Sequence, residues 1–302
     1  MTALAFRRDF QPEYGMAVRV APGVRRLSAR NPGPFTFRGT NTYLIGEGPV
    51  VVVDPGPEDA DHHAALLAAI GDAGVARILV THTHRDHSGG VAALSLATGA
   101  PTAGGGRHRP ARPLGAGEVN LLDTAADTGF VPDLVLGDGA AIDAGGIGMV
   151  AIATPGHTAN HLAFALPDLG LLLTGDHVMG WSTSIVAPPD GSMADYMASL
   201  DRVLAQPEDR YLPGHGGPID DAHGWVAALK QHRLDRQRAI LARLAAGDTT
   251  IPAIVAAVYA GLDPALGAGA ALSVLAHLEE LIERGAVATD GAAGLAGVFR
   301  LA

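Results

Sequence analysis

Short apolar runs separated by turn residues recur along the first two thirds of the chain. Runs of this length, bounded by Gly, Pro and Asn, are typical of β-strands. Turn signals such as Asn31-Pro-Gly-Pro and Gly46-Glu-Gly-Pro lie between them. The pattern predicts strands over residues 18–20, 24–28, 42–45, 50–53, 140–142, 149–153, 161–166 and 171–174.

Helical periodicity alternates with these runs and takes over completely near the C-terminus. The predicted helices cover residues 58–73, 91–97, 194–206, 222–246, 251–259 and 271–284. A short glycine-containing hairpin over residues 286–301 follows the last helix. Helix, helix and hairpin in so few residues resemble a winged-helix unit. We therefore expect two domains, a catalytic one over residues 1–222 and a winged-helix-like one over residues 223–302.

The stretch from Thr81 to Gly90 interrupts this pattern with polar residues directly after an apolar run. Four side chains of metal-ligand type fall within six positions there: His82, His84, Asp86 and His87. A strand that ends in this stretch would point His82 and His84 to one side, because side chains alternate with a period of two. A helix that begins next would bring Asp86 and His87 to a neighbouring point. The spacing predicts two metal ions rather than an exposed polar turn.

Three further candidates share one local pattern, in which an apolar run ends, a glycine follows, and a ligand-type side chain comes next. They are His157, Asp176 and His215. Glycine permits a sharp turn there, so the three side chains are expected at one edge of the sheets. Asp54 also ends a strand, and it could either cap the next helix or hold a ligand histidine. His62 and His63, at the start of a helix, are expected to face solvent.

Composition narrows the chemistry. There is no cysteine, which excludes disulfides, thiolate ligands and cysteine nucleophiles. The net charge is 21 − 31 = −10, so the whole molecule does not attract phosphate backbones. Neither a signal peptide nor a membrane-spanning apolar segment is recognisable, and we expect a cytoplasmic protein without membrane contact.

Together these residues predict a dinuclear site. His82, His84 and His157 would hold one ion, Asp86, His87 and His215 the other, and Asp176 would bridge them. Nitrogen and oxygen ligands without sulfur suit two Zn²⁺ ions, with Fe²⁺ and Mn²⁺ as alternatives. Two such ions about 4 Å apart would share a hydroxide and stabilise negative charge at the attacked centre. The pattern therefore indicates a hydrolase, with Asp86 essential to catalysis.

The same motifs resemble the metallo-β-lactamase superfamily. Thr81-His-Thr-His-Arg-Asp-His-Ser-Gly-Gly90, Pro155-Gly-His157-Thr158, Gly175-Asp176 and Gly214-His215-Gly216 match its ligand series in order and spacing. The resemblance implies an α/β fold, an αββα sandwich with the dinuclear site at one edge. Cysteine-ligand β-lactamases are excluded, and no substrate-clamping C-terminal segment of the glyoxalase II kind is found.

A closer resemblance, over nearly the whole chain, is to the β-lactamase-like protein 2 group. It rests on residues 31–44, 195–200, 211–218 and 232–236 and on the winged-helix-like tail. An animal member of that group cleaves single-stranded RNA. The substrate is therefore expected to be either a small ester, thioester or lactone, or an RNA phosphodiester. The basic loop Arg107–Arg112 favours RNA or is simply a solvated loop, whereas the acidic net charge favours small molecules.

Two functions of other classes stay open. One is a single-iron oxidoreductase of the persulfide-dioxygenase type, and the other is a winged-helix nucleic-acid-binding protein with a vestigial metal site. From Trp225 onward seven basic residues balance seven acidic ones, which disfavours simple DNA reading. Packing or homodimer formation is the role we expect of the C-terminal domain.

Overall fold

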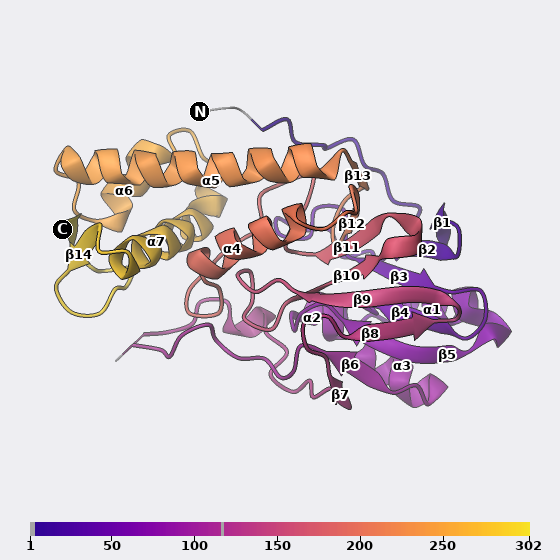
Figure 1. The fold of residues 1–302 in the computed structure, drawn as a ribbon. Coiled ribbons are helices and arrows are strands. Elements are labelled where there is room, and N and C mark those ends of the chain that lie inside the picture. Colours follow the sequence, from indigo (N-terminus) through magenta and orange to yellow (C-terminus); the bar gives the residue numbers. More distant parts are fainter. Residues whose placement is uncertain (1–3, 116–117) are drawn as a thin grey trace.

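Two β-sheets packed face to face form the centre of the larger part of the molecule in the computed structural model, which describes residues 4–115 and 118–302 (Figure 1). In the described ranges the first sheet has seven strands, in the order β1 (Val18–Ala21), β2 (Val24–Ser28), β3 (Asn41–Ile45), β4 (Val50–Val53), β5 (Val75–Val80), β6 (Thr102–Gly104) and β7 (Leu134–Val135). Strands β1 to β4 are antiparallel, and β4 to β7 are parallel.

The second sheet joins strands from the later part of the chain. Its order is β13 (Ile219–Asp220), β12 (Arg210–Pro213), β11 (Leu171–Gly175), β10 (Leu162–Leu166), β9 (Ile147–Ala153) and β8 (Ala141–Ala144). Only β11 and β12 run parallel among these pairs. The inward side chains of both sheets, such as Val51, Leu79 and Phe164, make one buried apolar layer.

Helices cover both outer faces, which confirms the αββα sandwich expected from the family resemblance. Helices α1 (Ala60–Ile70) and α3 (Val91–Thr98) pack on the first sheet through residues such as Leu66 and Leu94. Helix α4 (Met193–Leu204) and the start of α5 (Ala222–Ala245) pack on the second (Figure 1). A single turn of helix, α2 (Arg85–Ser88), follows β5, and short 3₁₀ turns span Gly71–Ala73, Asp123–Ala125, Pro167–Leu169 and Pro264–Leu266.

The C-terminal part has a core of its own. It comprises the second half of α5, α6 (Ile251–Val258), α7 (Gly267–Glu283) and the hairpin of β14 (Val287–Thr289) and β15 (Phe299–Leu301). Ile240, Ile254, Leu278 and Phe299 meet at its centre. The predicted winged-helix unit is therefore confirmed. No helix within the described ranges combines the length and the apolar character needed to cross a membrane.

Candidate metal centre

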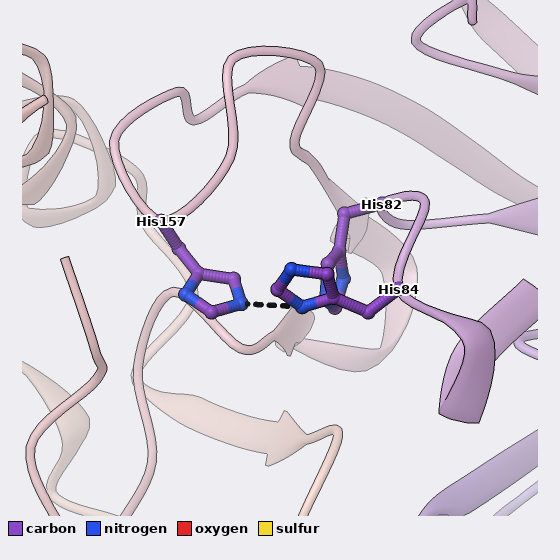
Figure 2. Close-up of side chains that lie close together, drawn as sticks. All are labelled: His82, His84 and His157. Atoms are coloured by element: carbon purple, nitrogen blue, oxygen red, sulfur yellow. Dashed lines mark hydrogen bonds between the residues drawn. The ribbon is translucent and has the colours of Figure 1, made fainter. Parts of the chain in front are cut away.

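Three histidines from two sheets meet at one edge of the sandwich. His82 and His84 lie in the turn after β5, and His157 lies in the loop between β9 and β10 (Figure 2). His82 Nε2 is 3.0 Å from His84 Nδ1, and His157 Nε2 is 3.1 Å from the same atom. All three side chains are buried, and one nitrogen from each lies within 4.8 Å of the others. Converging imidazole nitrogens at this spacing suit a single cation.

A second group lies beside the first. Asp86 and His87 come from α2, and His215 comes from the loop after β12. His87 Nε2 is 3.3 Å from Asp86 Oδ2, and His215 Nε2 is 3.2 Å from that oxygen. Asp86 remains about a quarter exposed, while both histidines are buried. This group also satisfies the donor set of a divalent cation.

Asp176, directly after β11, lies between the two groups. Its Oδ1 is 3.5 Å from His87 Nε2, and its Oδ2 is 3.3 Å from His215 Nε2 and 3.8 Å from His157 Nε2. Oδ1 is buried and has no hydrogen-bond donor among the described residues. A buried carboxylate oxygen without a donor costs free energy. The seven side chains therefore fit two cations that share Asp176.

Charge is distributed unequally between the groups. Burial lowers the pKa of His82, His84 and His157, that of His84 to about 3, so their nitrogens keep free lone pairs. Burial would also lower the pKa of His215, but Asp176 and Asp86 outweigh it and raise that pKa to about 9. Asp86, Asp176 and Asp54 likewise raise the pKa of His87 above its usual range. Without metal, protons on His87 and His215 therefore balance the carboxylates.

Asp54, at the end of β4, supports this centre from behind. Its Oδ2 accepts a hydrogen bond from His87 Nδ1 at 2.9 Å, and both of its oxygens accept from Thr81, at 2.7 Å each. Donation from Nδ1 leaves His87 Nε2 facing the site. Helix α1 is capped by Asp59 instead. Of the two roles open for Asp54 in the sequence, the structure therefore shows the contact with His87.

Two other candidates are oriented by backbone carbonyls. His157 Nδ1 donates to Ile185 O at 2.7 Å, and His215 Nδ1 donates to Gly39 O at 3.2 Å. In each ring, this contact occupies Nδ1 and leaves Nε2 facing the site, where it can bind a cation in the neutral form of the ring. Thr40 Oγ1 donates to Asp86 Oδ2 at 3.1 Å and so restrains that carboxylate as well.

Two glycines are required by close packing here. Gly175, with φ of 47°, precedes Asp176, and a Cβ would lie 2.8 Å from His161 Nε2 and from Thr81 Oγ1. At Gly214 a Cβ would lie 2.6 Å from Asp176 Oδ1. Contacts this short would displace Asp176 itself at Gly214 and the supporting side chains of His161 and Thr81 at Gly175, so both positions need glycine.

Two histidines outside the predicted ligand set lie differently from what the sequence indicates. His62 is 5% exposed rather than solvated, because it packs under Gly56 and lies 3.0 Å from Thr42 Oγ1. His161 was missed as part of the centre. Its ring lies 5.1 Å from that of His82, and its Nε2 accepts from Asp176 N at 3.2 Å. A histidine at the start of an apolar strand was the only signal in the sequence.

The basic loop is held in place by the protein itself. Arg112 pairs with Glu118 and Glu279 at 2.7 and 2.6 Å. Arg109 donates to Ala159 O at 2.9 Å, and His108 lies 3.0 Å from Thr83 Oγ1. The charge of Arg112 is therefore compensated, and contacts through Arg109 and His108 hold the loop against the rest of the protein.

A pocket of about 120 Å³ opens onto five of the seven side chains, His84, Asp86, His157, Asp176 and His215, and its other walls are largely apolar. Those walls include Phe35, Leu122, Met179, Trp181 and Ile185. Trp181 stacks on Phe37 with ring centroids 4.9 Å apart. The centre therefore faces a small apolar chamber.

Comparison with known proteins agrees with this geometry. Residues 35–215 match the metallo-beta-lactamase superfamily, and residues 250–294 match the beta-lactamase associated winged helix domain. The chain thus belongs to the metallo-beta-lactamase superfamily, whose members are generally metal-dependent hydrolases.

Particular relatives match over most of their length. A beta-lactamase-like protein 2 homolog of Caenorhabditis elegans is 30% identical over 74% of this chain and 71% of its own. An atrochrysone carboxyl ACP thioesterase of Aspergillus chevalieri is 31% identical over 75% and 67%. A metallo-beta-lactamase family protein from Thermus thermophilus superimposes with a TM-score of 0.75 at 27% identity, covering 94% of this chain and 100% of that one.

Proposed function

We propose that this protein is a dinuclear metal-dependent hydrolase that cleaves an acyl ester or thioester. The proposal rests on one observation: two groups of three candidate ligands lie side by side with Asp176 beside both, and five of these seven side chains line one pocket. Zn²⁺ is the first candidate for both ions, with Fe²⁺ and Mn²⁺ next, because all the ligands are imidazoles and carboxylates.

In this proposal every side chain has a stated role. His82, His84 and His157 would hold the first ion and Asp86, His87 and His215 the second, and Asp176, which lies near side chains of both groups, would contribute to both. When bound, such ions activate water at neutral pH and stabilise negative charge at the attacked carbonyl. Asp54 and the carbonyls of Ile185 and Gly39 keep the rings in orientation. The apolar walls exclude bulk water, which strengthens the electrostatic interactions inside.

The acyl substrate is favoured over RNA by the walls of the pocket. Side chains such as Phe35, Leu122 and Met179 suit an acyl group and offer nothing to a phosphate backbone. Arg112, one of the charges of the loop Arg107–Arg112 expected to meet RNA, is already paired with two glutamates. The name of the Aspergillus chevalieri relative, an ACP thioesterase, supports the same substrate class. A single-iron oxidoreductase would use only one of the two ligand groups.

Metal content and Asp86→Ala test this proposal. Protein purified without chelator should contain about two metal ions per chain by elemental analysis. Asp86→Ala should lower kcat on acyl thioesters by more than the roughly 10–100-fold typical of outer-shell changes. Asp72→Ala, which removes an exposed carboxylate in the 3₁₀ turn after α1, serves as the control and should keep full turnover. Less than one ion per chain, or normal turnover by Asp86→Ala, would refute the proposal.

We also propose that residues 1–222 carry the chemistry and that residues 223–302 act as an accessory domain. Separate cores support this division. Helix α5 takes part in both, with Trp225 and Val226 in one core and Ile240 and Leu244 in the other. The two parts are therefore joined by a continuous helix rather than by a flexible linker.

A further inference from the structure

A second cavity adjoins the metal-site pocket. This interdomain groove, about 350 Å³ in volume, runs between the segment Trp181–Ile185 and helices α5 and α7, and its wall includes Tyr259 and Leu262, which follow α6. It shares six wall residues with the metal-site pocket: Pro34, Phe35, Trp181, Ser182, Thr183 and Ile185. Because the metal-site pocket holds only about 120 Å³, a larger substrate would extend into the groove.

The groove is lined by cationic side chains without acidic ones. Arg8 comes from the N-terminal segment, and Arg233 and Arg236 come from α5; no Asp or Glu is among the lining residues that the structure describes. Arg233 is only 4% exposed. In the described part of the chain, no carboxylate forms an ion pair with Arg8, Arg233 or Arg236. Arg233 and Arg236 lie three residues apart on one helix face, so their guanidinium groups repel each other. No carboxylate among the described residues offsets this repulsion by pairing with them.

Contacts with the protein fix these groups without neutralising them. The Arg233 guanidinium donates to Ser184 O and lies 5.2 Å from the centre of the Tyr196 ring. Arg236 donates to Val258 O at 2.6 Å and lies 4.2 Å from the centre of the Tyr259 ring. Arg236 Nε is buried and has no acceptor among the described residues. Guanidinium groups that are held by neutral acceptors, with one buried donor left over, are features of a preorganised anion site.

One short segment connects this groove to the metal centre. Ser184 O accepts from Arg233, and the next carbonyl, Ile185 O, accepts from His157. The segment is therefore fixed on one side by Arg233 of the groove and on the other by His157 of the metal centre. A substrate that occupies both cavities would cross the segment beside Trp181.

We propose that the interdomain groove binds a terminal phosphate of the substrate whose acyl bond lies at the metal centre. The inference rests on the proposed acyl hydrolase function. Its substrates are then acyl thioesters of a phosphorylated thiol, with 4′-phosphopantetheine as the simplest probe. A phosphate dianion balances more of the charge of three arginines than one carboxylate does, and it accepts several N–H bonds at once.

Kinetics with paired substrates test this assignment. Acyl-4′-phosphopantetheine and acyl-pantetheine differ only in the phosphate. The wild-type metalloenzyme should prefer the former about tenfold in kcat/KM, mainly through KM, as expected for one charge-assisted contact. Arg236→Gln and Arg8→Gln should lose this preference while hydrolysing acyl-pantetheine normally. Arg238→Gln removes an exposed arginine of the same helix that pairs with Asp235, and it should retain the preference.

Several results would overturn the assignment. Wild-type enzyme without preference for phosphate, or Arg236→Gln equally impaired on both thioesters, would show that these arginines only support the fold. Equal preference for a carboxymethyl group in place of the phosphate would refute the phosphate class. Loss of single-stranded RNA binding in Arg236→Gln, with unchanged thioester kinetics, would point to nucleic acid instead.

Failure of the proposed hydrolase function can be distinguished from failure of the groove assignment. If neither thioester is hydrolysed, the acyl hydrolase proposal falls, whatever the groove binds. Calorimetric titration of 4′-phosphopantetheine into the metal-loaded protein then tests the groove alone. Phosphate bound at the metals would survive Arg236→Gln, whereas groove binding should weaken about tenfold in Arg236→Gln and stay unchanged in Arg238→Gln. Equal binding by all three proteins would refute the site.

Discussion

Asp54 adopts a left-handed backbone conformation, with φ of 52°, at the point where β4 ends. Non-glycine residues rarely occupy this region, although Asp and Asn tolerate it best. The conformation aims the carboxylate at Thr81 and His87, which it binds with three hydrogen bonds. Local strain at this position therefore accompanies the orientation of one candidate ligand.

Asp54→Asn removes the negative charge of this side chain while it keeps the backbone conformation. Asn tolerates the same φ but cannot accept from both Thr81 and His87 with a full negative charge. We expect metal affinity to fall about 10–100-fold, because an outer partner of a ligand histidine is lost. Competition with a chromophoric chelator measures this change. Asp72→Asn should leave the affinity unaltered, and an Asp54→Asn protein that matches it would contradict the role given to Asp54.

Residue identity alone did not reveal which histidines are buried. The spacing of His82, His84, Asp86 and His87 was informative because four ligand types in six positions are rare in a turn. The sequence predicts an exposed His62 because nothing of ligand type follows at i+4, yet Thr42, from a distant strand, contacts its ring. Contacts of this kind depend on how strands pair, which no local pattern encodes.

At the scale of elements, strands and helices followed the apolar pattern closely. Strand β4 and helix α5 were predicted within a residue of their observed bounds. Strand β5, however, ends at Val80, so His82 and His84 converge through a turn rather than through strand alternation. Strand β7 was not predicted because it has two residues, and both are exposed. The interdomain groove could not be predicted, because it joins Arg8 to residues of α5 that are remote in sequence.

Helix α7 buries a histidine whose ionisation opposes folding. His277 is 1% exposed, and neither ring nitrogen has a partner among the described residues. Burial, and then the nearby Arg233, lowers its pKa from 6.5 to about 3. Below pH 6.5 the unfolded chain therefore binds a proton that the folded chain does not. Stability from this group is thus lost as the pH falls from 6.5 toward 3.

His277→Leu should remove that pH dependence. The variant should gain stability over wild type as the pH falls, by about 2 kcal/mol more at pH 5 than at pH 8, from the linkage slope of roughly 1.4 kcal/mol per unit. Urea unfolding of the chelated proteins at both pH values measures the difference, since the metal centre then contributes equally to both. A gain of the same size at pH 5 and pH 8 would contradict the buried neutral state.

For the whole molecule, the candidate ligands join both sheets. His84 and Asp86 follow a strand of the first sheet, while His157, Asp176 and His215 follow strands of the second. Bound cations would therefore link the two sheets at one edge. Because a ligand that binds only the folded state stabilises it, metal removal should lower the stability of the entire sandwich.

Loss of one ion to a chelator should lower the melting temperature by about 10 °C, and loss of both ions by about twice as much. An ion present at 1,000 times its dissociation constant contributes roughly 4 kcal/mol, and for a chain of this size each kcal/mol corresponds to about 2–4 °C. Thermal unfolding with and without chelator, followed by addition of Zn²⁺, measures the effect. His215→Ala should show a smaller shift than wild type. A melting temperature that stays the same after chelation and after addition of Zn²⁺ would contradict a contribution of metal to stability.

The wall from Trp181 to Ile185 also has a consequence for inhibitor design. Since the metal-site pocket and the interdomain groove share this wall, two weak fragments could be joined across it, a chelating one and an anionic one. Joining them makes the second binding event intramolecular, so its effective concentration reaches the millimolar range for a short linker. A compound that joins the two fragments would bind more tightly to proteins that have both cavities than to relatives that have only the metal centre.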